Sequence, residues 1–319
     1  MAMFDVICLG ELLIDFTSLQ PGASMIETTG FEKHAGGGPA NVAVGVSRLG
    51  GSAAFLGMVG NDEFGRYLAA MLAERGVDIR GLRYSDTAHT TLAFVALGEN
   101  GEREFIFYRN PGADMLYGPG DVDDVLFTEG RIFHHGSISF ISAPNREATL
   151  RAIALAQANH CLISFDPNLR LNLWDDPLAA HAGILLGLPS ADIVKVSEEE
   201  LQFITGQTDR EVGMRLLRDR GIPVVVVTLG EAGCAYAWGE HTGQVPGCPA
   251  VPVDTTGAGD AFVAGMLFQL VRRKLPPTAL TQAGVEEILA FANTVAARVV
   301  SRRGAIPAMP TMEEIADGL

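Results

Sequence analysis

The sequence predicts an α/β fold in which a mainly parallel sheet is covered by helices on both faces. Short apolar runs that read as buried strands alternate along most of the chain with segments of helical period. This alternation is typical of parallel sheets, because their strands need crossover helices. The chain has 319 residues, which suits one large domain with a small appendage.

The first strand is expected at residues 4–9, where a short apolar run ends at Gly10. The later strands share this character and are expected at 53–59, 131–133, 162–165, 193–196 and 224–228. The helices share an apolar period near that of an α-helix and are expected at 42–49, 63–75, 146–158, 178–188, 212–220, 285–300 and 312–315. Sites in such sheets lie beyond the carboxyl ends of the strands, where the sequence places Asp15, Asn168, Arg170, Ser197 and Gly230.

Residues 81–109 interrupt this alternation. Two strand-like runs, 90–97 and 103–108, flank residues 98–101, whose Asn-Gly pair is a hairpin turn signal. A hairpin without a crossover helix cannot be buried on both faces within the main sheet. We therefore expect residues 81–109, together with parts of 11–35, to project as a small β lid.

The composition excludes several classes of protein. The chain is 48% hydrophobic, which fits a folded globular protein, and its net charge of −15 argues against nucleic acid or an anionic membrane as partner. The four cysteines show no metal-binding spacing, so we expect reduced thiols. No basic leader and no apolar run of bilayer length is visible, so we expect a cytoplasmic protein.

The most informative motif is Asp-Thr-Thr-Gly-Ala-Gly-Asp at residues 254–260, directly before the apolar helical pattern 261–267. Small residues before a helix leave its first N–H groups free to bind an anion such as phosphate. Asp260 would repel that phosphate unless it takes a proton from an attacking hydroxyl, so the motif predicts phosphoryl transfer to an alcohol. The N–H groups that would stabilise the transferred group belong to Gly257, Ala258 and Gly259. The alternative is an ordinary helix capped by Asp254 and Thr255.

A second glycine-rich loop, Gly-Gly-Gly-Pro-Ala-Asn at residues 36–41, opens another helical pattern. Two such loops suggest two walls of one cleft. Neither is a Walker loop, because Gly-Lys-Ser/Thr does not occur in the chain. Asn41 stands where a dinucleotide-binding motif would have its third glycine, so the loop is a poor match for that motif as well.

With these loops the sequence resembles the ribokinase-like (PfkB) family of carbohydrate kinases. Residues 35–43 match the family's first signature and 254–260 match its second. Within the family, residues 108–116, 165–170 and 195–200 look most like fructokinases. The resemblance covers essentially the whole chain and implies a three-layer sandwich with a small β lid that covers the sugar and often pairs two subunits. A homodimer through the lid is therefore expected.

The resemblance also implies a sugar site. Asp15 would hold sugar hydroxyls, Asn41 offers both a donor and an acceptor, and the backbone of Gly36, Gly37 and Gly38 would approach the sugar closely. Asp15 could instead be a solvated loop acid and Asn41 a structural amide. Arg109 and Arg170 are the cations expected at the cleft, although both could be surface residues. Similar arginines meet a substrate carboxylate in 2-keto-3-deoxygluconate kinases.

For ATP and magnesium, Ser197 and Glu200 match a family Asn-x-x-Glu motif in which Ser197 replaces the Asn; a helix-face carboxylate is the alternative for Glu200. The residues that the resemblance assigns to the nucleotide are Lys195, Ser197, Glu200, Thr228, Gly230, Gly233 and Asn293. Those that it assigns to a potassium ion, largely through carbonyl groups, are Asp254, Thr256, Val299 and Gly304.

Together, these observations predict an ATP-dependent sugar kinase that makes fructose 6-phosphate from fructose, with ATP, Mg²⁺ and K⁺ as cofactors. The alternative substrate is 2-keto-3-deoxygluconate. An alternative from another class is a catalytically silent sugar or nucleotide sensor on the same fold, against which the intact Asp260 argues.

Overall fold

The computed structural model describes residues 3–20, 22–97 and 103–316. A large sheet has the order β13-β12-β11-β10-β9-β8-β1-β4-β5, and the pairs from β11 through β5 are parallel. Its strands are β1 (Phe4–Leu9), β4 (Ala53–Gly60), β5 (Val77–Ser85), β8 (Gly130–Gly136), β9 (Leu162–Asp166), β10 (Ile193–Ser197), β11 (Val224–Thr228), β12 (Cys234–Trp238) and β13 (His241–Val245). This arrangement confirms the expected mainly parallel central sheet.

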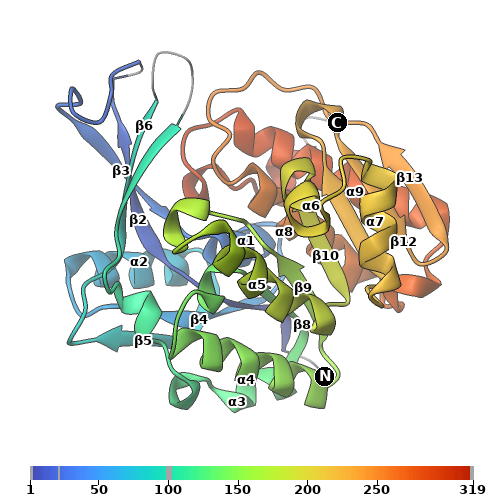
Figure 1. The fold of residues 1–319 in the computed structure, drawn as a ribbon, viewed down its shortest axis with the longest axis horizontal. Helices are drawn as coiled ribbons and strands as arrows, with labels where there is room; N and C mark the ends of the chain where they lie inside the picture. The colour runs from blue at the N-terminus through green and yellow to red at the C-terminus, as the bar shows by residue number, and fades with distance from the viewer. Residues whose placement is uncertain (1–2, 21, 98–102, 317–319) are drawn as a thin grey trace.

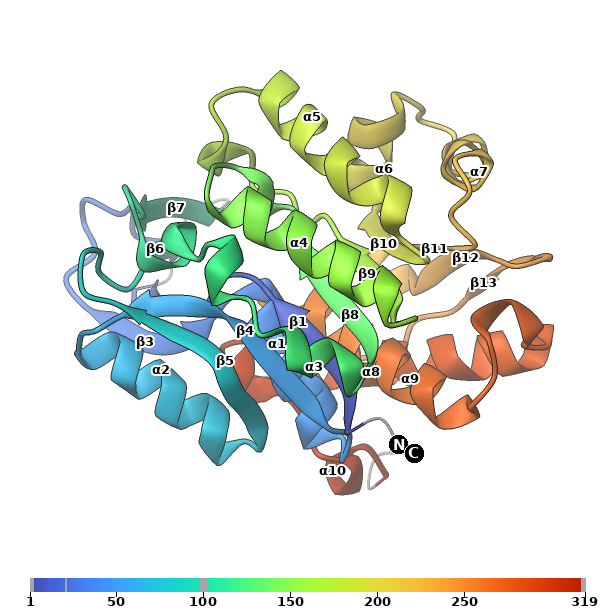
Figure 2. The ribbon, with the colours of Figure 1, turned by 90° about the horizontal axis from the view of Figure 1, so that it is seen from below.

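Helices cover both faces of this sheet, as Figures 1 and 2 show. One face packs against α1 (Gly38–Arg48), α2 (Glu63–Glu74), α8 (Ala258–Arg273), α9 (Gln282–Val300) and α10 (Met312–Ala316). The other packs against α3 (Asp124–Thr128), α4 (Asn145–Ala158), α5 (Pro177–Gly187), α6 (Glu198–Thr205) and α7 (Arg210–Asp219). The result is the three-layer sandwich that the sequence predicts.

Strand β11 shows why continuous apolar runs form the centre of the sheet. Val224 and Val226 point into one hydrophobic core, whereas Val225 and Val227 point into the other, and all four are fully buried. Successive strand residues face opposite sides, so a strand covered on both faces needs apolar residues at every position.

A smaller sheet with the order β3-β2-β6-β7 projects from one side of the sandwich (Figure 1). Its strands are β2 (Leu13–Ser18), β3 (Phe31–Gly36), β6 (Leu92–Leu97) and β7 (Arg103–Tyr108). Strands β6 and β7 pair antiparallel with each other, and β2 joins β6 to β3. The predicted turn at 98–101 lies outside the described residues.

Two parts of the fold differ from the sequence-based expectation. Residues 81–85 belong to β5 at the edge of the large sheet, not to the small sheet. The segment Val77–Ser85 mixes apolar and polar residues because one side of this edge strand is partly exposed. For this reason it was not recognised as a strand from the sequence. The antiparallel hairpin of β12 and β13 was also missed; it completes the opposite edge of the sheet.

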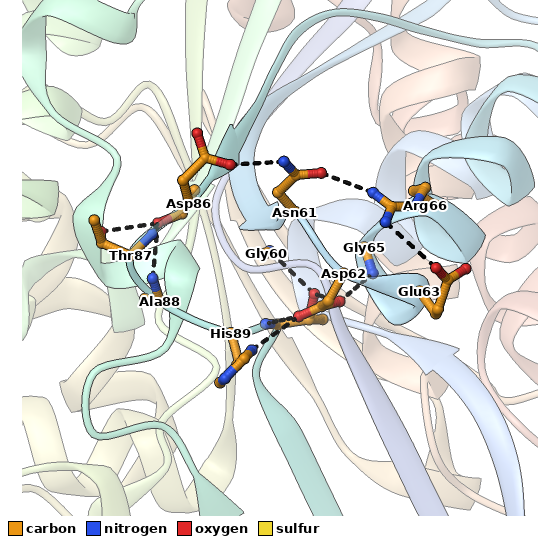
Figure 3. Close-up of polar contacts among 12 residues, drawn as sticks. Gly60, Asn61, Asp62, Glu63, Gly65, Arg66, Asp86, Thr87, Ala88 and His89 are labelled. Atoms are coloured by element: carbon orange, nitrogen blue, oxygen red, sulfur yellow. Dashed lines mark hydrogen bonds and ion pairs between the residues drawn. The ribbon is translucent and has the colours of Figure 1, made fainter.

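Asp62 attaches the small sheet to the sandwich (Figure 3). Its carboxylate accepts hydrogen bonds from the N–H of Gly65, at the start of α2, and from both the N–H and the hydroxyl of Thr90, each at 2.8 Å. The Gly60 N–H also donates to the Thr90 hydroxyl at 3.0 Å. The chain just before β6 is thus fixed to the ends of β4 and α2.

Candidate active site

The first turn of α8 begins without a side-chain cap. Gly257 precedes the helix with a φ of 78°, a left-handed conformation that suits glycine, and no side chain caps the helix. A methyl group on Gly257 would lie 2.6 Å from the Cβ of Ala305. The glycine is therefore required by both conformation and space, and it leaves the N-terminus of α8 accessible to a ligand.

Asp260 lies in this first turn and is buried, with 8% of its surface exposed. Its Oδ2 accepts a hydrogen bond from Nδ2 of Asn41 at 2.7 Å, and Nδ2 of Asn168 lies 3.4 Å from its Oδ1. Burial raises the pKa of Asp260 to about 6, while the Asn41 hydrogen bond acts to lower it. Such a carboxylate is ionised near neutral pH yet basic enough to accept a proton from a hydroxyl.

A cleft of about 180 Å³ joins the two glycine-rich loops in front of Asp260. The predicted site residues that line it are Asp15, Gly37, Gly38, Asn41, Arg170, Lys195, Thr256, Gly257, Gly259 and Asp260. The side chain of Phe107 from β7 and that of Leu13 from β2 contribute to the same lining, so the small sheet forms one wall.

Asp15 and the loop at Gly36 are packed directly against each other. A methyl group on Gly36 would collide with Oδ2 of Asp15, and one on Gly38 would lie 2.6 Å from Nδ2 of Asn168. Burial raises the pKa of Asp15 to about 7, opposed by the charge of Arg170. In the α1 helix, Asn41 has a buried Oδ1 without a hydrogen-bond partner in the described chain, which leaves an acceptor for a ligand.

Glu11 is a cleft residue that sequence reasoning did not select. It is 6% exposed, and its Oε1 accepts a hydrogen bond from the N–H of Gly38 at 2.7 Å, at the N-terminus of α1. Burial raises its pKa to about 7. The available signal was a carboxylate directly after the first strand, four residues before Asp15.

The two predicted arginines are separated. Arg170 is exposed and lines the cleft. Arg109 instead forms a buried ion pair with Asp114, with Nη2 and Nε 2.7 and 2.8 Å from Oδ2, and it lines a neighbouring cavity of about 800 Å³. The expectation that Arg109 points into the same cleft is therefore corrected: a carboxylate five residues later already holds its guanidinium.

Glu200 and Ser197 form a capping box at the start of α6. The Ser197 hydroxyl accepts from the Glu200 N–H at 3.1 Å, and Glu200 Oε2 accepts from the Ser197 N–H at 2.8 Å. Glu200 Oε1 accepts from the Leu169 N–H at 2.7 Å. The carboxylate thus fixes the segment that carries Asn168 and Arg170 to α6.

The remaining residues assigned to the nucleotide lie away from the cleft, around the end of β11. Thr228 ends that strand, and Gly230 and Gly233 follow with φ angles of 58° and 96°. Asn293 in α9 donates from Nδ2 to the carbonyl of Pro246 at 3.0 Å. It therefore supports the backbone that follows β13, next to the loop of Gly233.

Asp254 joins the segments that were assigned to a potassium ion. Its Oδ1 accepts from the Thr256 N–H and hydroxyl at 2.9 and 2.7 Å, and its Oδ2 accepts from the Gly304 N–H at 3.0 Å. Val299 is fully buried in the last turn of α9. Carbonyl groups at a helix C-terminus carry partial negative charge, so these residues fit a monovalent cation.

Across 3–20, 22–97 and 103–316, no helix is long and apolar enough to cross a membrane. Within the same ranges, no three or more His, Cys, Asp and Glu side chains are grouped so that they could hold a metal ion.

Comparison with known proteins decides the family. Residues 3–312 match the pfkB family carbohydrate kinase. The chain belongs to this family. A relative from Arabidopsis thaliana described as probable fructokinase-7 is 48% identical over 316 residues, which cover 98% of this chain and 91% of the relative. The predicted family is therefore confirmed, and the protein is a phosphotransferase that acts on a sugar hydroxyl.

Solved structures agree with this kinase fold. Fructokinase from Xylella fastidiosa with bound ATP superposes with a TM-score of 0.88 at 35% identity, covering 99% of this chain and 98% of that one. Fructokinase from Vibrio cholerae O395, bound to fructose, ADP and calcium ion, gives 0.86 at 36% identity, covering 98% and 97%. A double mutant of the Vibrio enzyme, with potassium ion instead, gives 0.88 at 35% identity, covering 99% and 98%.

Proposed function

We propose that this pfkB kinase phosphorylates fructose with ATP to give fructose 6-phosphate. The observation that carries the proposal is the buried Asp260, held by Asn41 at the open N-terminus of α8 and facing a cleft that Asp15 also lines. The fructokinase names of the relative and of the superposed structures support fructose as the sugar.

In this mechanism Asp260 accepts the proton of the sugar hydroxyl while its oxygen attacks the γ-phosphorus of ATP. The new O–P bond forms as the bond between the γ-phosphorus and the bridging oxygen breaks, and ADP leaves. The N–H groups of Gly257, Ala258 and Gly259 stabilise the charge on the transferred group. Asp15, Asn41 and the backbone of Gly36, Gly37 and Gly38 hold the sugar.

The charges around the cleft favour a neutral sugar over a sugar acid. Asp15, Glu11 and Asp260 contribute three carboxylates to its lining, whereas Arg109, which could have met a substrate carboxylate, is held by Asp114. Arg170 remains as the exposed arginine of the lining. Lys195 is the second cation of the lining, so a substrate carboxylate would meet three carboxylates against two cations, which argues against 2-keto-3-deoxygluconate.

The nucleotide and the ions complete the proposal. We assign Lys195, Ser197, Glu200, Thr228, Gly230, Gly233 and Asn293 to the nucleotide site, directly or by supporting its backbone. Magnesium would accompany the phosphates, and potassium would bind at Asp254, Thr256, Val299 and Gly304. A homodimer through the small sheet and a cytoplasmic location also belong to the proposal; sedimentation and cell fractionation test them.

The deciding experiment measures ADP release by the wild-type protein with fructose, other neutral sugars and 2-keto-3-deoxygluconate, each with ATP and Mg²⁺. Fructose-dependent ADP release supports the proposal. If the protein turns over only 2-keto-3-deoxygluconate, that acid and not fructose is the substrate. No turnover with any acceptor, despite ATP binding, would favour a sensor.

A further inference from the structure

Glu11 holds the first turn of α1 from outside the helix. The residue lies in the loop between β1 and β2, and its Oε1 accepts a hydrogen bond from the N–H of Gly38, the first residue of α1, at 2.7 Å. Gly37, which precedes the helix, has no side chain that could cap it, and no acidic residue lies within the described first turn, residues 38–41. Glu11 therefore supplies a cap that the sequence of α1 itself lacks.

The glycine-rich loop is packed around Glu11. Gly37 has a φ of 116°, and a methyl group on it would collide with the carbonyl oxygen of Glu11. A methyl group on Gly38 would lie 3.4 Å from Oε1 of Glu11 and 3.5 Å from Oδ1 of Asp260. Glu11, Gly38 and Asp260 also line a common cavity of only about 10 Å³, so the first turn of α1 has little room to shift.

The same turn of α1 carries Asn41. The Asn41 N–H donates to the carbonyl of Gly37 at 2.8 Å, and its side-chain Nδ2 donates to Oδ2 of Asp260 at 2.7 Å. The bond from Gly38 to Glu11 thus fixes the start of the helix, and the Asn41 amide extends from that first turn to the carboxylate of Asp260. A shift of the turn would move this amide, and a misplacement of about 1 Å can cost about 10²-fold in rate.

We propose that Glu11 is a positioning residue: by capping α1 it sets Asn41, and through Asn41 it sets the carboxylate of Asp260 that accepts the proton of the sugar hydroxyl. The inference rests on the proposed function for the role of Asp260 as the base. Glu11 transfers no proton in this role. Burial raises the pKa of Glu11 to about 7, but a carboxyl oxygen can accept the Gly38 hydrogen bond in both protonation states.

Two other roles would also make Glu11 important. It could contribute only to the stability of the fold, or it could bind the sugar directly, because it lines the cleft. A double-mutant cycle with Asn41 separates both roles from positioning. Glu11→Ala removes the cap, Glu11→Gln keeps an oxygen that can accept from Gly38, and Asn41→Leu removes the link to Asp260. Glu74→Ala is the matched control, because Glu74 is exposed in the last turn of α2.

The cycle is measured with fructose at a pH well above the pKa of Asp260. We expect Glu11→Ala to lower kcat by roughly 10–10²-fold. Glu11→Gln should stay within about fivefold of wild type, because it keeps the acceptor, and Glu74→Ala should equal wild type. In the Asn41→Leu background, Glu11→Ala should lower kcat by less than about twofold, because the link through which Glu11 acts is already absent.

A measurement without substrate tests the cap itself. Hydrogen exchange of the backbone amides of Gly38 and Asn41, followed by NMR spectroscopy in the ligand-free protein, should be at least about fivefold faster in Glu11→Ala than in wild type. Glu11→Gln should restore slow exchange. The amide of Val212, which donates to the capping side chain of Asp209 at the start of α7, should exchange equally in all variants.

The inference is overturned if Glu11→Ala keeps more than about half of the wild-type kcat, or if it lowers kcat by the same factor in the wild-type and Asn41→Leu backgrounds. Unchanged exchange at Gly38 and Asn41, or a Glu11→Gln variant no more active than Glu11→Ala, would overturn it as well. If Glu11→Ala does not fold, Glu11→Met, which fills similar space without a carboxyl oxygen, is judged by the same criteria.

Failure of the wild type to turn over fructose would count against the proposed function alone. The cycle can then be measured with whichever acceptor supports ADP release, and the exchange measurement needs no acceptor.

Discussion

Asn41 and Asp260 lie 219 residues apart in the chain and form a 2.7 Å hydrogen bond from the Asn41 amide to the Asp260 carboxylate. The bond joins the two glycine-rich loops, because Asn41 is in the first turn of α1 and Asp260 in the first turn of α8. A sugar hydroxyl in the cleft would meet the base and the remaining Asn41 acceptor together.

Asp260→Asn should leave the fold intact and lower kcat by roughly 10²–10⁴-fold, because the amide keeps the shape of the side chain but cannot accept the proton. Steady-state kinetics with fructose, with circular dichroism as a folding control, measure this. If the variant keeps more than about a third of the wild-type kcat, Asp260 is not the general base.

Activity should depend on the ionisation of Asp260. The carboxylate must be deprotonated to act as a base, so kcat should fall as the pH drops through about 6, the pKa to which burial raises it. Asn41→Leu removes a hydrogen bond that lowers this pKa, so the acid limb should move to higher pH. Profiles of kcat against pH for the wild type and Asn41→Leu test the direction of this shift. An acid limb at the same pH or at a lower pH in the variant contradicts the prediction.

Substrate should order the small sheet. Asp62 fixes the chain at Thr90, so movement should begin beyond that residue, and closure would exclude water that competes as phosphoryl acceptor. Hydrogen exchange in residues 91–97 and 103–108, measured with and without saturating fructose, is the test. We expect slower exchange with the sugar; identical exchange in both states rules out a mobile lid.

Potassium should raise activity at fixed ionic strength. Asp254 ties Thr256 and Gly304 together beside the loop that opens α8, so a cation bound there would organise the N–H groups of that loop. Sodium and a bulky organic cation should activate less. Rates compared in the three chloride salts check this, and equal rates would remove the cation site from the proposal.

The fold was largely predictable, because its strands and helices follow local periodicity. Continuous apolar runs such as Val224–Thr228 mark strands buried on both faces, and the predicted helices agree with the observed ones to within a few residues. The missed strands β5 and β13 lie at the two edges of the large sheet, where partial exposure mixes polar residues into the pattern. The third missed strand, β12, is buried throughout and lies next to β13. Periodicity is weakest where burial is incomplete.

The sequence predicted the site residues that belong to a recognisable motif. It predicted less well the residues whose position depends on a contact made only in the folded protein. The loop at 254–260 and Asn41 were found from the sequence, and they lie together in the structure. Arg109 could not be placed in this way, because pairing with Asp114 requires that both side chains turn toward the same buried space. Glu11 was missed because a carboxylate that holds a backbone N–H leaves no local sequence pattern.

The last prediction separates recognition of a neutral sugar from recognition of a sugar acid. We expect kcat/KM for fructose to exceed that for 2-keto-3-deoxygluconate at least about tenfold, and Asp15→Ala to reduce fructose turnover by the equivalent of about 1–3 kcal/mol, because it leaves sugar hydroxyls unpaired.

Arg109→Ala should act differently. It leaves Asp114 buried without its cation, so thermal unfolding should show a loss of about 3–5 kcal/mol, while the folded fraction retains most of its fructose turnover. Kinetics with both acceptors and thermal unfolding of both variants provide the comparison. Preference for the acid, together with a larger kinetic defect in Arg109→Ala than in Asp15→Ala, would reassign the substrate to 2-keto-3-deoxygluconate.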